Sequence, residues 1–67
     1  MKAISGKDMC RLLEKRGWVR LRTRGSHFTY SKTGLPNVTV PVHGNQSLKK
    51  GMQNGIMKVA GLSEDDL

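Results

Sequence analysis

The feature that most constrains this 67-residue chain is a change in the spacing of its apolar residues. Met9, Leu12 and Leu13 recur at the three- and four-residue spacing of one helix face. Between residues 18 and 43, apolar and polar residues alternate in three short runs, which is typical of strands. Residues 48–59 return to helical spacing. The predicted order of elements is therefore α-β-β-β-α.

Short connections limit how these elements can be arranged. We expect a three-stranded antiparallel sheet with both helices on one face, which leaves the other face exposed. This is an α+β fold, and residues 1–67 are long enough for one domain. The acidic tail, residues 63–67, is expected to be loose because it follows the end of the second helix.

The helices carry recognisable end signals. Ser5 and Asp8 have the S-x-x-D spacing of a capping box, so the first helix is expected to begin there. Gly17 suits the left-handed position after a helix, and Gly61 does the same for the second helix. Ser47 is expected to cap the second helix. The predicted buried stripe of that helix comprises Leu48, Met52, Ile56 and Val59.

Alternation in the strands predicts which residues share a face, because a slip of one residue turns every side chain over. Phe28 and Tyr30 are expected to face the core with the valines of the third strand. The simplest register pairs Phe28 with Val42 and Tyr30 with Val40. The same argument pairs Leu21 of the first strand with Phe28.

This register predicts a basic cluster at one rim of the exposed sheet face. His27 is expected opposite His43 and beside Arg22, with Arg20 and Arg24 nearby. An imidazole can transfer a proton near neutral pH, and guanidinium groups can hold a phosphate. Two histidines without a neighbouring carboxylate or second cysteine make a poor metal site, so we predict no metal and no other cofactor. A purely structural histidine pair is the alternative.

The charge of the chain favours a polyanionic partner. Twelve Lys and Arg against five Asp and Glu give a net charge of +7, and Glu64, Asp65 and Asp66 lie in the tail. A compact body this basic attracts nucleic acid, the commonest polyanion in a cell. A solvated basic scaffold is the alternative. A membrane surface is disfavoured, because no helix opposes a wide apolar face to a purely basic one.

The single cysteine, Cys10, cannot form an internal disulfide. We interpret it as a small apolar residue of a reduced cytoplasmic protein rather than as a nucleophile. No apolar leader and no membrane-spanning run follow Met1, which also favours a cytoplasmic location.

RNA cleavage by internal transesterification fits this predicted site. One imidazole accepts the proton of a ribose 2′-hydroxyl, whose oxygen attacks the adjacent phosphate. Cationic side chains stabilise the developing negative charge. This chemistry needs no metal, and it spares DNA, which lacks the 2′-hydroxyl.

The same residues resemble a known family, the HicA-type toxins of bacterial and phage toxin–antitoxin modules. The resemblance rests on Gly-Ser-His-Phe-Thr-Tyr at residues 25–30, Val-Pro-Val-His at residues 40–43 and the helical run from Lys50 to Leu62. It covers almost the whole chain, from Ser5 to about Leu62. It implies a fold like that of double-stranded-RNA-binding domains and an endoribonuclease that degrades mRNA. It also implies a HicB antitoxin that covers the site.

The resemblance places the family's catalytic histidine on His27. Residues expected to support catalysis or to bind phosphate are His43, Arg22, Arg24, Arg20 and Ser26. Residues expected to contact RNA elsewhere are Lys32, Lys49 and Lys50. A non-catalytic RNA-binding module of the same fold is the alternative function, and an adaptor for an acidic protein is a third.

Overall fold

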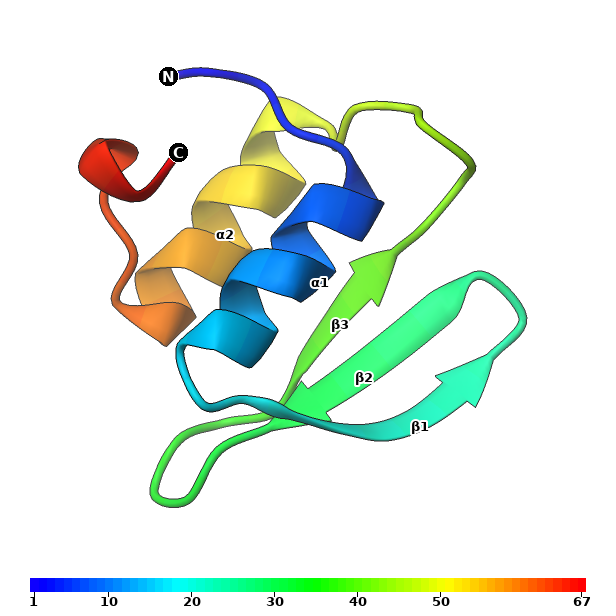
Figure 1. Ribbon diagram of the computed structural model, residues 1–67, viewed down its shortest axis with the longest axis vertical. Helices are drawn as coiled ribbons and strands as arrows, with labels where there is room; N and C mark the ends of the chain where they lie inside the picture. The colour runs from blue at the N-terminus through cyan, green and yellow to red at the C-terminus, as the bar shows by residue number, and fades with distance from the viewer.

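The computed structural model describes residues 1–67 and has the predicted order of elements. The helices and strands are α1 (Gly6–Lys15), β1 (Val19–Arg24), β2 (His27–Ser31), β3 (Val38–Pro41), α2 (Lys50–Ala60) and the short 3-10 helix η1 (Glu64–Asp66). The strands form one antiparallel sheet in the order β1-β2-β3, and α1 and α2 cover one of its faces (Figure 1). The predicted α+β fold is confirmed. Neither helix combines the length and apolar character that a bilayer span requires.

The core lies between the two helices and the face of the sheet that they cover. Met9 and Leu13 of α1 meet Tyr30 and Val40 of the sheet there, and all four are fully buried. The other buried apolar residues are Ile4, Cys10, Trp18, Val38, Leu48, Ile56, Met57 and Leu62.

The ends of α1 form as predicted. The Ser5 hydroxyl accepts a hydrogen bond from the backbone amide of Asp8, at 3.1 Å. At the other end Gly17 has a φ of 88°, and the Trp18 amide donates to the Leu13 carbonyl at 3.0 Å. This is a Schellman motif, which pairs carbonyl groups that the helix leaves free.

Helix α2 differs from its prediction at its start and along its buried face. Ser47 lies in an isolated bridge to the segment before α1, and the N-cap is Lys49, whose side chain makes no capping hydrogen bond. Leu48 lies before the N-cap and is buried as part of the loop. Its position therefore does not indicate which face of α2 is buried. As a result Met52 is 46% exposed, whereas Gln53 is fully buried. The helix ends as predicted at Gly61, with a φ of 68°.

The buried amide of Gln53 ties the N-terminal segment to α2. Its oxygen accepts from the Ile4 amide at 3.1 Å, and its nitrogen donates to the Lys2 carbonyl at 2.7 Å. The Ile4 carbonyl in turn accepts from the Leu48 amide at 2.8 Å. The segment that leads into α1 is therefore held on both sides.

The β1–β2 hairpin closes more tightly than predicted. Phe28 pairs with Thr23, so the predicted pair with Leu21 is wrong. The ladder also shifts between Arg20 and Arg22, which marks a β-bulge. A bulge adds one residue to one strand and reverses the alternation beyond it. Leu21 is therefore 52% exposed instead of facing the core.

The pairing of β2 with β3 keeps the predicted face but not the predicted register. Tyr30 pairs with Val38 rather than Val40, and Phe28 pairs with Val40 rather than Val42. The register is thus wrong by two residues, which leaves the same side chains facing the core. Lys32, the residue after β2, lies outside the sheet, and its ammonium contacts the carbonyl of Arg16 at the end of α1.

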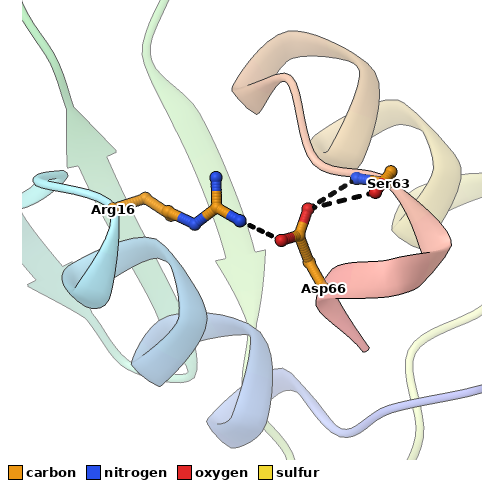
Figure 2. Close-up of polar contacts among 3 residues, drawn as sticks. All are labelled: Arg16, Ser63 and Asp66. Atoms are coloured by element: carbon orange, nitrogen blue, oxygen red, sulfur yellow. Dashed lines mark hydrogen bonds and ion pairs between the residues drawn. The ribbon is translucent and has the colours of Figure 1, made fainter.

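The C-terminal tail, which the sequence predicts to be loose, forms the short helix η1 and contacts the end of α1. The Asp66 carboxylate accepts hydrogen bonds from the amide and hydroxyl of Ser63, which forms a capping box for η1. Its other oxygen accepts from the guanidinium of Arg16 (Figure 2). The Met1 ammonium lies 3.0 Å from a Glu64 oxygen. The negative tail is held by positive groups at the helix end and the N-terminus.

Candidate active site

The face of the sheet that neither helix covers carries the candidate catalytic histidine. His27 begins β2 and is exposed, and its neighbours across the sheet are Arg24 of β1 and Pro41 of β3. Directly opposed residues in an antiparallel sheet have Cβ atoms about 4.5–5.5 Å apart. A phosphate placed against the imidazole therefore lies within reach of the Arg24 guanidinium.

A second arginine lies on the same face. Arg22 is opposite Thr29, which is two residues along β2 from His27. Diagonal neighbours of this kind are about 7–8 Å apart, within reach of a long side chain. Thr29 and Thr39 form the next pair on the same face, beside the His27–Pro41 pair, and their hydroxyl oxygens are 3.1 Å apart. The exposed face thus combines one imidazole with two guanidinium groups, and between them Thr29 is buried against Thr39.

Arg20 does not join this cluster, because the bulge in β1 places it on the face that the helices cover. It is opposite the buried Tyr30. Its guanidinium carbon lies 5.2 Å from the centre of the Phe28 ring, which is a cation–π contact. Arg20 therefore covers the edge of the core, contrary to its predicted place near His27.

His43 does not lie opposite His27, because β3 pairs in a different register from the one predicted. Pro41 occupies that position, and β3 ends there. His43 follows two residues later and is exposed. It lines a pocket of about 250 Å³ between the loop after β3 and the start of α2. The two histidines are therefore separated by the end of β3.

The remaining predicted residues fall in different places. The Ser26 carbonyl accepts from the Val42 amide at 2.7 Å, which holds the end of β3 against the start of β2. Lys32 lies beyond the opposite end of β2, about 17 Å along the strand from His27. Its ammonium donates to the Arg16 carbonyl at 2.6 Å. Lys49 is exposed and lines the same pocket as His43.

The electrostatics of the exposed face are uniformly positive. The chain has no Asp or Glu between Lys15 and Ser63, so no strand carries a carboxylate. The acidic residues lie on α1 and in the tail, where Asp8 pairs with Arg11 at 3.1 Å. Nothing on the sheet competes with a phosphate for Arg22 or Arg24.

A buried polar group stands apart from this face. The Tyr30 hydroxyl donates to a Glu14 carboxylate oxygen at 2.6 Å. Burial, with this hydrogen bond, raises the pKa of Tyr30 well above its usual range. Burial also raises the pKa of the Cys10 thiol. Cys10 therefore remains protonated, which makes it a poor nucleophile.

Sequence reasoning missed the pocket beside His43, to which Gln46 and Met52 also contribute. Periodicity assigned Met52 to the core, and no motif marks Gln46 as a pocket residue. The available signal is a polar loop, residues 43–47, followed directly by an apolar residue, Leu48, and the two lysines at the start of a helix.

The fold and this face define a small basic α+β domain with an exposed, arginine-bearing antiparallel sheet. The chain belongs to the HicA toxin family, because the model of the HicA toxin of bacterial toxin–antitoxin systems matches residues 6–62. It is also similar to a solved chain from a toxin–antitoxin complex of Streptococcus pneumoniae. The two are 35% identical with a TM-score of 0.74, over 88% of this chain and 98% of that one. Among curated protein sequences, no significant match is found.

Proposed function

We propose that this HicA-family toxin is an endoribonuclease that cleaves mRNA without a metal ion and acts in the cytoplasm. The observation that carries the proposal is the pairing of His27 with Arg24 on an uncovered, carboxylate-free sheet face. An imidazole beside a guanidinium supplies a proton acceptor and a phosphate ligand at one place.

In the proposed reaction His27 is the general base. The imidazole accepts the proton of a ribose 2′-hydroxyl, and the 2′-oxygen forms a bond to the adjacent phosphorus. The bond from phosphorus to the 5′-oxygen breaks, and that oxygen takes a proton from solvent. The imidazolium of His27 returns its proton to solvent, and the products are a 2′,3′-cyclic phosphate and a 5′-hydroxyl.

Arg24 and Arg22 bind the reacting phosphate and its neighbour. Charge-assisted hydrogen bonds from guanidinium groups strengthen as negative charge develops on the phosphate oxygens. Lys49 and Lys50, exposed at the start of α2, bind phosphates further along the RNA. Lys32 is proposed only as a peripheral RNA contact. Its ammonium already donates a hydrogen bond to the Arg16 carbonyl at the end of α1.

We also propose a HicB-type antitoxin that neutralises the toxin by covering the exposed sheet face. The similarity to a chain from a toxin–antitoxin complex supports a protein partner. The carboxylate-free face favours an acidic surface on that partner, because opposite charges accelerate and orient association. Antitoxin binding and RNA binding are then mutually exclusive.

The test uses purified protein, single-stranded RNA and the His27→Ala variant. Wild-type protein is expected to cleave RNA in the presence of EDTA and to leave DNA of the same sequence intact. General acid–base catalysis contributes about 10²–10⁴-fold, so His27→Ala is expected to lose at least that factor in rate. RNA affinity is expected to persist, because the arginines remain. Cleavage at the wild-type rate by His27→Ala, or its loss in EDTA, contradicts the proposal. RNA that is bound but never cut indicates the non-catalytic module instead.

A further inference from the structure

The pocket beside His43 takes no part in the reaction proposed above. It has a volume of about 250 Å³ and lies where the loop after β3 meets the first turn of α2. Its apolar lining residues are Pro41, Met52 and the buried Leu48. Four polar residues also line it: His43, Gln46, Ser47 and Lys49. An apolar hollow with a few polar groups is the usual form of a small-ligand site.

The pocket adjoins the proposed catalytic face through one shared residue. Pro41 pairs with His27 across the sheet, and the same proline lines the pocket. Opposed residues in this ladder are about 5 Å apart. A nucleotide whose phosphate lies against His27 therefore has its neighbour within reach of the pocket.

The start of α2 is unfavourable in the isolated protein. Lys49 and Lys50 stand at the positive end of the helix, its first turn has no acidic residue, and its N-cap makes no side-chain hydrogen bond. Cations at this end are destabilising, and a good cap stabilises a helix by about 1 kcal/mol. Met52, in the same turn, leaves a large apolar side chain 46% exposed. One ligand with an anionic group and a flat apolar group offsets both defects.

We propose that this pocket binds one unstacked nucleobase of the single-stranded RNA, next to the phosphate that is cut, and thereby selects the cleavage site. The inference rests on the proposed function and deepens it. His43 provides a ring on which the base stacks, Met52 and Pro41 contact its apolar surface, and the Gln46 amide bonds its polar edge. Single-stranded RNA is commonly recognised by stacking on aromatic side chains of this kind. The role of His43 is then to bind the base rather than to transfer a proton.

A binding experiment separates the pocket from catalysis. The His27→Ala protein is titrated with a short single-stranded RNA and with versions that lack one base at each successive position. Stacking of one base contributes about 1–3 kcal/mol, so one position is expected to lose about 5- to 150-fold in affinity. When His43→Ala or Met52→Ala is added, the penalty at that position is expected to fall below about twofold. Leu35→Ala, at an exposed apolar residue of the β2–β3 loop (43% exposed), is the matched control and keeps the full penalty.

The outcomes distinguish this inference from the proposed function. Cleavage by wild-type protein tests the function alone, whereas the abasic penalty is measured without cleavage. The inference is overturned if the penalty survives in His43→Ala and Met52→Ala, or if no position shows one. It is also overturned if these two variants weaken only antitoxin binding, which identifies the pocket as a protein contact. Thermal unfolding of both variants near the wild-type temperature shows that the exposed side chains, not the fold, were changed.

Discussion

Replacing Gly6 with alanine tests a close approach between α1 and the end of β3. A Cβ atom at Gly6 is 2.1 Å from the carbonyl oxygen of Pro41 and 3.1 Å from the Cα of Val42. Both are backbone atoms, so no side-chain rotation relieves the clash. Ordinary contact begins at 3.4 Å, so the helix and the strand must separate by about 1 Å.

The size of the effect follows from two opposed terms. Overpacking of this kind typically costs about 1–3 kcal/mol, and a backbone clash belongs at the upper end of that range. Alanine favours a helix over glycine by at most about 1 kcal/mol. We therefore expect Gly6→Ala to lower the free energy of unfolding by about 2 kcal/mol. In a domain of this size that corresponds to a fall in Tm of about 8–16 °C.

Gly55→Ala is the matched control because the same substitution is expected to have the opposite sign. A Cβ atom at Gly55 of α2 meets no atom within 4 Å. This variant gains the helix preference without a clash, and is expected to stabilise the protein by about 1 kcal/mol. Urea unfolding followed by the fluorescence of Trp18, which is 2% exposed, measures both variants. The steric reasoning is refuted if Gly6→Ala is as stable as wild type, or if both variants shift in the same direction.

Two further predictions concern buried polar groups. Gln53→Met leaves the Ile4 amide and the Lys2 carbonyl without partners, so we expect a loss of about 2–4 kcal/mol in urea unfolding and faster hydrogen exchange at the Ile4 amide. A loss below about 0.5 kcal/mol contradicts the role assigned to that amide. The pKa of Tyr30 is near 10 in the unfolded chain and is raised in the folded protein. The contribution of Tyr30 to the free energy of unfolding is therefore complete below pH 10. Above pH 10 it declines by about 1.4 kcal/mol per pH unit. In urea titrations between about pH 9 and 11, Tyr30→Phe is expected to lose this dependence on pH. A residual slope from Cys10 remains, because the pKa of Cys10 is also raised. An unchanged slope refutes the assignment of the pH dependence to Tyr30.

The sequence predicts the elements and faces of this fold well because those depend on local periodicity. The N-cap hydrogen bond of Ser5 and the terminal glycines act within one helical turn, and both are confirmed. Tyr30 and Phe28 were expected on the core side because side chains alternate along a strand, and the observed pairing keeps that face. Each of these predictions requires knowledge of only a few neighbouring residues.

The register of the strands, and the face of the sheet on which some side chains lie, could not be predicted in the same way. The exact partner of Phe28 depends on the turn lengths and on a bulge that no residue type in β1 predicts. Both strand pairs differ in register from the prediction. One inserted residue in β1 is enough to carry Arg20 to the covered face. The shift of β3 likewise replaces His43 with Pro41 as the neighbour of His27. The predicted cluster therefore keeps its histidine and two arginines and loses its second imidazole.

Pro41 connects the stability of this domain with its proposed activity. Its carbonyl oxygen touches the first turn of α1 at Gly6, its position in the ladder faces His27, and it lines the pocket that contains His43. A displacement of about 1 Å at this residue moves the imidazole relative to the proposed base pocket, and misplacements of that size can reduce catalysis about 100-fold. Gly6→Ala is therefore expected to slow RNA cleavage under conditions where the variant is still fully folded. Gly55→Ala, which does not touch Pro41, is expected to cleave at the wild-type rate.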